Sequence, residues 1–269
     1  MNLGINMHAS LKECLISLGK QDYTNAYMHL FFEFENNSDK KIAEELKKIL
    51  TSNFIRDRQS KSGGLLNLKK TGFNPTVVYD VGAQVGTMEL YNTFPDAHHV
   101  LIEPVIECIP ALEAIAAKIK SATILNCAIS NVNGLVPLSV SETKQYASIG
   151  TTEGQETRQI QSRTMNSISE DLKIHGPCLL KIDVDGFEIE VLKGSKELLL
   201  DEQTVILIEA SMADTNPRFG RIVEYLSQFN FDIYDIVDAL YRPNDWHLWQ
   251  VDAIFMKKSS NLWTNKEFN

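Results

Sequence analysis

From Pro75 onward, short runs of aliphatic and β-branched residues alternate with segments whose apolar residues recur at helical spacing. This alternation is typical of parallel strands, which are buried on both faces and are joined by covering helices. It restricts the chain to a doubly wound α/β architecture. We expect strands near 76–81, 99–103, 123–127, 178–183, 204–209, 231–236 and 251–257, and helices near 86–93, 107–119, 187–200 and 218–228.

The last two expected strands, between Phe231 and Lys258, have only a loop between them. Because a parallel pair needs a crossover of about a dozen residues or more, we expect these two strands to be antiparallel. The interval 129–170 is polar and strand-like without a long helix, which favours a hairpin and flap over the catalytic edge. The prediction is a mostly parallel, Rossmann-like seven-stranded sheet with an antiparallel last strand.

Residues 1–70 contain no convincing strand and repeat apolar residues such as Leu11, Leu15 and Leu18 at helical spacing. We therefore predict a helical N-terminal extension over 1–70 and an α/β domain over 71–269. Apolar helix faces of this kind suit either a homodimer contact or a cover over part of the core, and the sequence does not choose between them.

The formal net charge of -9 leaves no general basic surface to attract phosphate backbones, so nucleic acid is not an expected partner. No apolar run approaches the roughly 20 residues that span a bilayer, and no signal-peptide core is present, which predicts a cytoplasmic protein without membrane insertion. The four cysteines are scattered without a Cys-x-x-Cys pair, so neither a disulfide framework nor a zinc site is expected.

The first expected strand runs through a small-residue turn into a helix, with Asp80, Gly82 and Gly86 along the turn. Such a turn lets backbone approach a ligand closely, and the helix start offers unpaired amides. A pyrophosphate dinucleotide would require Gly-x-Gly-x-x-Gly, but Gln84 and Thr87 replace the second and third glycines. The remaining pattern suits a methionine moiety whose amino group meets Asp80; the alternative is a purely structural glycine turn.

The next expected strand ends in Glu103, where a carboxylate can accept hydrogen bonds from two ribose hydroxyls. The third ends at Asn126-Cys127-Ala128, where we expect contact with adenine through backbone and small side chains. Alternatively, Glu103 is a surface carboxylate and the third strand end only packs. Acids at two consecutive strand ends favour a nucleoside-bearing ligand.

These segments resemble the FkbM family of S-adenosylmethionine-dependent methyltransferases, and the resemblance covers roughly residues 75–258. In two places the chain departs from the family pattern, with Gln84 where Asn is usual and Asp185 where Glu is usual. The segments that carry the resemblance are Asp80-Val81-Gly82-Ala83 with Gly86, Ile102-Glu103-Pro104, Asn126-Cys127-Ala128-Ile129-Ser130 and Leu180-Lys181-Ile182-Asp183-Val184-Asp185-Gly186-Phe187-Glu188 continuing to Val191-Leu192-Lys193-Gly194.

The resemblance implies S-adenosylmethionine as the methyl donor and O-methylation of a hydroxyl on a sugar, nucleotide-linked sugar or glycan. Alternatives are a secondary-metabolite hydroxyl, a nucleotide-sugar-modifying NAD enzyme, or a noncatalytic protein that keeps a nucleoside pocket. The residues expected to bind the methyl donor are Asp80, Gly82, Ala83, Gln84, Gly86, Glu103, Asn126, Cys127, Ala128 and Asp183.

Asp183 is the first candidate for the methyl-transfer site, because ligands bind outside the carboxyl ends of parallel strands. Lys181 would share its face of the strand and could hold Asp183 ionised. The alternative is a carboxylate that only anchors the following helix. Glu209 ends the neighbouring strand, and with Asp183 and Asp185 it could gather a magnesium ion. The resemblance does not demand a divalent metal, so none is expected.

The loop 241–249 follows the sixth strand and should hang over the same edge. Trp246 and Trp249 could form a surface on which a sugar stacks. His247 is the alternative base, because an imidazole titrates near neutral pH. Equally, the indoles could pack a hairpin and leave His247 in water.

Overall fold

The computed structural model describes residues 58–141, 147–150, 156–212 and 218–263. The chain divides into two compact units, Met1–Ser60 and Lys61–Asn269. The helices expected before residue 58 lie outside the described residues. Helix α4 (Lys61–Lys70) falls within the predicted extension, yet it belongs to the second unit, where Leu65 and Leu68 are fully buried. Among the described helices, none is long and apolar enough to cross a membrane.

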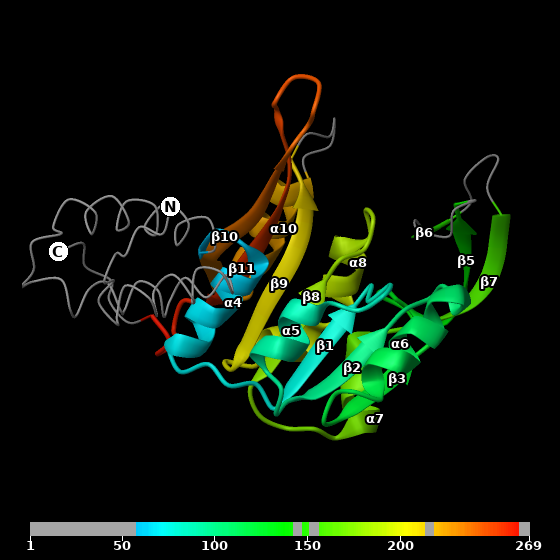
Figure 1. Cartoon of the computed structure of the whole chain (residues 1–269), viewed down its shortest axis with the longest axis horizontal. Coiled ribbons are helices and arrows are strands. Elements are labelled where there is room, and N and C mark those ends of the chain that lie inside the picture. Colours follow the sequence, from blue (N-terminus) through cyan, green and yellow to red (C-terminus); the bar gives the residue numbers. More distant parts are fainter. Residues whose placement is uncertain (1–57, 142–146, 151–155, 213–217, 264–269) are drawn as a thin grey trace, which may run out of the picture. The chain divides into compact units, whose positions relative to one another are not determined.

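The main sheet has seven strands in the order β10-β11-β9-β8-β1-β2-β3 (Figure 1). The five strands from β9 to β3 pair in parallel, while β11 is antiparallel to both β9 and β10. The predicted fold class is therefore confirmed, including the antiparallel last strand. The strands are β1 (Val77–Val81), β2 (His98–Ile102), β3 (Ala122–Leu125), β8 (Cys178–Ile182), β9 (Thr204–Ser211), β10 (Phe231–Tyr241) and β11 (Leu248–Lys257).

Helices cover both faces of this sheet because successive strand side chains point to opposite sides. Val77 belongs to one apolar core and Val78 to the other, and each core buries its strand residues against a different set of helices. The first core packs on α7 (Met165–Leu172), α8 (Glu188–Lys193), α9 (Lys196–Leu200) and α10 (Arg218–Ser227), and the second on α4, α5 (Met88–Thr93) and α6 (Ile109–Ala116).

Two expected helices differ in detail from the sequence prediction. A short 3₁₀ turn, η2 (Ile106–Cys108), precedes α6, with Pro110 in the first turn of the helix. The helix expected over 187–200 is split into α8 and α9 around Gly194. A Cβ atom at Gly194 would lie 2.1 Å from the Ser130 carbonyl oxygen, so this break lets the chain pass close to a second sheet.

The second sheet has four strands in the order β4-β7-β5-β6. These strands fall almost entirely within the interval 129–170, for which the sequence predicted a hairpin and flap. Strand β5 pairs antiparallel with both β6 and β7, which confirms the hairpin. Helix α7 follows β7 directly, in a region where the sequence pattern predicted no helix. The strands are β4 (Ala128–Ile129), β5 (Gly134–Val140), β6 (Ala147–Ile149) and β7 (Glu156–Arg163).

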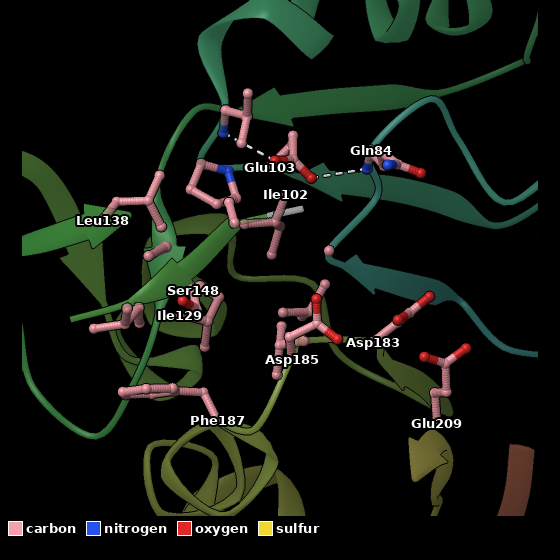
Figure 2. A pocket seen from close by; sticks show the side chains of 18 of the residues that line it. Gln84, Ile102, Glu103, Ile129, Leu138, Ser148, Asp183, Asp185, Phe187 and Glu209 are labelled. Carbon is pink, nitrogen blue, oxygen red and sulfur yellow. Dashed lines mark hydrogen bonds between the residues drawn. The ribbon is translucent and has the colours of Figure 1, made fainter. Parts of the chain in front are cut away.

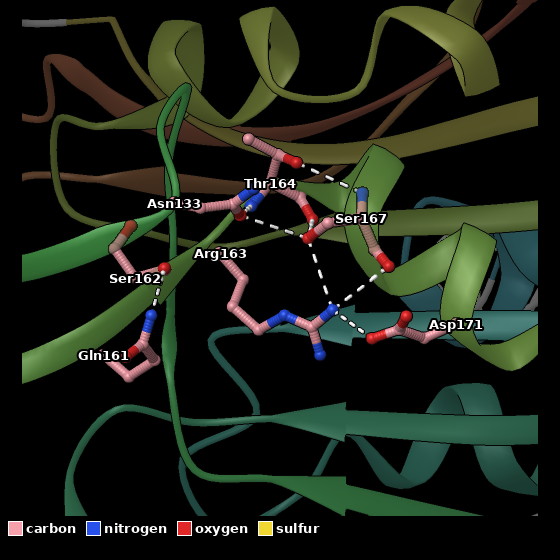
Figure 3. A network of polar contacts seen from close by, with 7 residues as sticks. All are labelled: Asn133, Gln161, Ser162, Arg163, Thr164, Ser167 and Asp171. Atoms are coloured by element: carbon pink, nitrogen blue, oxygen red, sulfur yellow. Dashed lines mark hydrogen bonds and ion pairs between the residues drawn. The ribbon is translucent and has the colours of Figure 1, made fainter.

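A polar network fixes this small sheet to α7 (Figure 3). Arg163, the last residue of β7, forms an ion pair of 2.5 Å with Asp171 on α7. Thr164 caps α7 by accepting a 3.1 Å hydrogen bond from the Ser167 amide, which satisfies one free N–H of the first turn. Asn133 Oδ1 accepts from the Thr164 amide and the Ser167 hydroxyl. The sheet is thereby held on a helix whose buried face packs in the main core.

Candidate active site

A cavity of about 380 Å³ lies at the carboxyl ends of the parallel strands (Figure 2). Strand ends and the turns after them supply its floor, including Gly82, Glu103, Asp183 and Glu209. The small sheet supplies one wall, which includes Leu138 and Ser148. The β10–β11 hairpin supplies another through Leu240, Trp249 and Gln250. In Figure 1 this hairpin extends past the ends of the neighbouring strands.

Gly82 brings the turn after β1 into close contact with β8. Its φ is +75°, and a Cβ atom there would lie 1.9 Å from the Asp183 carbonyl oxygen, so no other residue fits without moving backbone. Lys181 Nζ donates a 2.9 Å hydrogen bond to the Gly82 carbonyl. The predicted glycine turn therefore joins two strand ends and also lines the cavity.

The other residues of this turn divide between cavity and core. Gln84 lines the cavity, with a φ of +46° that L-residues seldom adopt. Ala83 is buried, and Gly86 packs against Tyr91 and Ile115; neither lines the cavity. Their direct contact with the methyl donor stays a prediction.

Asp80 is completely buried and does not line the cavity. Its Oδ1 forms a 2.9 Å ion pair with Lys181 and accepts from the Thr87 hydroxyl, while Oδ2 accepts from the Tyr91 hydroxyl at 2.5 Å. Burial alone would raise the pKa of Asp80, but Lys181 and Tyr91 lower it below the ordinary value of 3.8. Asp80 thus holds the turn in place through Thr87, Tyr91 and Lys181, and its contact with a ligand amino group stays a prediction.

Glu103 is also buried, yet its carboxylate faces the cavity. Oε1 accepts a 2.8 Å hydrogen bond from the Val105 amide and Oε2 one of 2.8 Å from the Gln84 amide (Figure 2). Each oxygen therefore accepts one hydrogen bond from a backbone amide and has a second lone pair with which it can accept another. Burial raises the pKa of Glu103 above 4.5, although the two amides partly offset it.

The third strand end supplies small side chains to the cavity, and their contact with adenine stays a prediction. Cys127 and Ala128 line the cavity, and burial raises the pKa of the Cys127 thiol to about 11, so it stays neutral. Asn126 is exposed and does not line the cavity. Its Nδ2 instead donates to the carbonyls of Glu103 and Pro104, which holds the end of β2 in place.

Asp183 and Glu209 meet at the ends of β8 and β9, where both line the cavity. The predicted pairing of Lys181 with Asp183 is present, with Nζ 3.3 Å from Oδ2. Burial opposes the charge of Lys181, but Asp80 and Asp183 together raise its pKa. Burial and the adjacent charge of Asp183 raise the pKa of Glu209 to about 8. At neutral pH the Glu209 carboxyl is therefore largely protonated.

Asp185 lies on the exposed turn after β8, at the rim of the cavity. Glu188, to which the sequence pattern gave no role, stabilises this turn by accepting a 3.1 Å hydrogen bond from the Gly186 amide. Arg218 on α10 pairs with the same carboxylate at 3.2 Å. No cluster of three or more His, Cys, Asp or Glu side chains able to hold a metal exists within the described ranges.

The β10–β11 hairpin brings Trp249 to the cavity but leaves His247 away from it. His247 is exposed, and its amide donates a 3.0 Å hydrogen bond to Asp245 in the hairpin turn. Trp246 is 78% exposed. The alternative assignment of His247 as base remains a prediction without a contact to the cavity.

The sequence suggested Ser148 as part of a flap that could close over the acceptor, and Ser148 lines the cavity. Three other cavity residues were not singled out: Leu138 and Ile149 come from the small sheet, and Phe187 lies among the charged residues after β8. In the sequence these three resemble ordinary strand or helix-start residues. Only the pairing of β5 with β6 places the small-sheet residues in one wall.

A family model described as the methyltransferase FkbM domain matches residues 80–233. No curated protein matches the chain. Among solved structures, a methyltransferase FkbM from Methylobacillus flagellatus KT is 13% identical with a TM-score of 0.49. The match covers 90% of this chain and 58% of that one, so this chain spans little more than half its length.

Two further solved structures are similar at comparable levels. A precorrin-6y C5,15-methyltransferase from Geobacter metallireducens GS-15 is 14% identical with a TM-score of 0.43, over 73% of this chain and 87% of that one. A 1,6-didemethyltoxoflavin-N1-methyltransferase from Burkholderia thailandensis is 12% identical with a TM-score of 0.40, over 84% of this chain and 93% of that one. Because the family model matches more than half of the chain, including all of the strand-end acids from Asp80 to Glu209, the chain belongs to the FkbM methyltransferase family.

Proposed function

We propose that this methyltransferase uses S-adenosylmethionine to O-methylate a hydroxyl of a sugar, nucleotide-linked sugar or glycan. The observation that carries the proposal is one cavity lined both by Glu103 and by Asp183 and Glu209. The first group suits a ribose, and the second suits proton transfer from an alcohol. A secondary-metabolite hydroxyl is the alternative acceptor.

The cavity residues fit the methyl donor. Glu103 keeps an acceptor position on each oxygen, Gly82 allows close approach of backbone, and Cys127 and Ala128 give a small-residue wall. The volume of about 380 Å³ lies within the usual range of about 300–1,000 Å³ for small-molecule sites. S-adenosylmethionine, when bound, supplies an electrophilic methyl group attached to a sulfonium.

An alcohol acceptor must lose its proton as its oxygen becomes an ether. In our proposal the Asp183 carboxylate accepts this proton, and Glu209 lies beside it at the end of the neighbouring strand β9. A positioned general base contributes typically about 10²- to 10⁴-fold to rate. Lys181 contacts both Asp183 and the Gly82 carbonyl, so it fixes the position of Asp183 relative to the turn after β1. A fixed base favours the alignment of acceptor and methyl group that in-line transfer requires.

The charge of the lining bears on the choice of acceptor. The charged side chains that line the cavity within the described residues are all acidic: Glu103, Asp183, Asp185 and Glu209. A phosphate would be repelled by such a lining, so among the proposed acceptors a neutral sugar or glycan is favoured over a nucleotide-linked sugar. Trp249 and Leu240 offer an apolar surface at the cavity edge against which a sugar ring could stack.

Calorimetric titration with S-adenosylhomocysteine and then with NAD tests the cofactor. Micromolar binding of the first and none of the second is expected; the opposite result would contradict the proposal. Transfer of labelled methyl from S-adenosylmethionine to a panel of neutral sugars, glycans, sugar nucleotides and aromatic alcohols then tests the acceptor.

Asp183→Asn tests the proposed base. Turnover should fall at least 100-fold with little change in donor affinity. Asp185→Asn, at the exposed rim of the same cavity, is the matched control and should keep most of the activity. An Asp183→Asn variant as active as the Asp185→Asn control would remove Asp183 from the reaction.

A further inference from the structure

The β10–β11 hairpin continues beyond the cavity that it helps to line. Leu240 on β10 and Trp249 on β11 line the cavity, yet their side chains remain 48% and 47% exposed. Trp246, in the turn between the two strands, does not line the cavity and is mostly exposed. In Figure 1 the hairpin extends past the carboxyl ends of the neighbouring strands. Large apolar side chains therefore stand both at the cavity edge and at the tip of the hairpin.

Irregular strand pairing shapes the part of the hairpin that meets the cavity. The register of β10 with β11 shifts between Val237 and Leu240, and again between Leu240 and Tyr241. Such bulges bend a strand and re-aim its side chains, and they are frequent beside active sites. Leu240 and its partner Gln250 on β11 both line the cavity. The hairpin is thus bent where it contacts the cavity, and its tip lies further along the same two strands.

Several hydrogen bonds hold the turn that carries Trp246. The Trp246 amide donates to the Arg242 carbonyl at 3.0 Å, and the Arg242 amide donates to the His247 carbonyl at 2.9 Å. The Arg242 guanidinium makes two contacts with the Asp245 carboxylate, of 3.1 and 2.5 Å. The turn is therefore ordered without a ligand, which lowers the entropic cost of binding one, and the charges of Arg242 and Asp245 compensate each other.

Trp246 has a backbone conformation that bulky residues seldom adopt. Its φ is +56°, in the left-handed region where Gly and Asn are favoured. Strained backbone of this kind collects at sites that clamp a ligand. Because Gly or Asn would form the same turn with less strain, the shape of the turn does not account for an exposed indole at this position.

Resting on the proposed function, we infer that Trp246 is a distal acceptor subsite, and that the acceptor is an uncharged glycan of several sugar units and not a free monosaccharide. Trp246 is three residues from Trp249, and three residues of extended chain span at most about 10 Å. A glycan with one sugar in the cavity reaches the tip only through further units. Indole faces suit sugar rings, and the paired charges of Arg242 and Asp245 suit an uncharged chain.

Chain length and the side chain at position 246 test this inference together. The acceptors are glucose, mannose and N-acetylglucosamine, each as the free sugar and as its linear hexasaccharide, with labelled S-adenosylmethionine as donor. In the wild type, kcat/KM should be at least tenfold higher for one hexasaccharide than for its free sugar. Trp246→Asn, which suits the turn but removes the indole, should lower this ratio about fivefold, mainly through the KM of the hexasaccharide.

Two further variants separate stacking from a structural role. Trp246→Phe keeps an aromatic ring and should retain at least half of the wild-type ratio. Leu200→Ala removes a comparably exposed side chain, 68% exposed on α9 and outside the cavity, and should retain all of it. If Trp246 only shaped the turn, Asn would be tolerated better than Phe, which is the opposite order. A wild type that does not prefer a hexasaccharide, or a Trp246→Asn variant that keeps the preference, would overturn the inference.

Other outcomes distinguish this inference from the proposed function. Methyl transfer to free sugars alone would leave the proposed function in place and overturn the inference. Calorimetric binding of a hexasaccharide that is lost in Trp246→Asn, without methyl transfer to any acceptor, would contradict the proposed function while the glycan subsite stood. A wild-type dimer that becomes a monomer in Trp246→Asn, measured by sedimentation, would assign the tip to a second copy of the chain and overturn the inference.

Discussion

Asp80 and Glu103 end neighbouring parallel strands, yet the structure gives them opposite surroundings. Asp80 is enclosed by Lys181, Tyr91 and Thr87 and has no exposed surface. Glu103 is held by two backbone amides and faces the cavity. The first carboxylate stabilises the turn that the ligand would approach, and the second would meet the ligand.

The difference follows from what stands beside each strand. Strand β1 lies between β2 and β8, and β8 contributes a lysine next to Asp80. Strand β2 is flanked by β3, whose end contributes no charged side chain to Glu103 but clamps its backbone through Asn126. A carboxylate at a strand end is therefore a binding residue only where its neighbours leave acceptor positions open.

The largest expected effect is on folding, from Asp80→Asn. Breaking a buried ion pair leaves Lys181 with only partial compensation, so the free energy of unfolding should fall by about 3–5 kcal/mol. Urea denaturation measures this. Asp96→Asn, whose carboxylate pairs with Lys120 at the surface, is the control and should leave stability nearly unchanged. If Asp80→Asn were equally stable but bound S-adenosylhomocysteine poorly, the contrast with Glu103 would be wrong.

Glu103→Gln should act mainly on binding. One oxygen becomes an amide donor and loses its acceptor position for a ribose hydroxyl, so the Kd for S-adenosylhomocysteine should rise about tenfold, or about 1.4 kcal/mol. Calorimetry measures the Kd, and urea denaturation should show a smaller loss of stability than Asp80→Asn. A variant with unchanged affinity would remove Glu103 from the binding site.

The pH dependence should separate the two carboxylates further. Asp80 has a lowered pKa, so its stabilising contribution is present above its unfolded value of 3.8 and is lost as pH falls through the lower folded value. Glu103 has a raised pKa, above 4.5, and must be ionised to accept two hydroxyls. On acidification, S-adenosylhomocysteine affinity should therefore weaken before the protein unfolds.

Calorimetry and circular dichroism over the same pH series check this order. Glu103→Gln provides the control, because its weaker affinity should lose the dependence on pH in that range. Unfolding that precedes the loss of affinity in the wild type would contradict the assignment of the two roles.

The smallest effect concerns the turn that both carboxylates support. Gln84 adopts a φ of +46°, a conformation that Asn tolerates better than most residues. Gln84→Asn should stabilise the protein by a few tenths of a kcal/mol, whereas Gln84→Ala should not. Thermal denaturation distinguishes the two, and equal melting temperatures would mean that the turn is not strained at this position.

Much of the fold was predictable because it rests on local patterns. The apolar runs located all seven strands of the main sheet, and the short connection after Phe231 predicted the antiparallel pairing of β10 with β11. The acids after the strands could likewise be assigned to one edge of the sheet. These features depend on residues that are close together in the chain.

Charge compensation could not be predicted in the same way, since it depends on strand neighbours and on contacts between distant residues. Only the tertiary structure places Lys61 on Asp252, opposite Glu209, and adds Asp80 to the Lys181–Asp183 pair that strand alternation had predicted. The sequence by itself determined which carboxylates reach the carboxyl edge of the sheet. Tertiary packing decided which of them are neutralised and which face the cavity, because desolvation and pairing are set by the residues that surround each group in space.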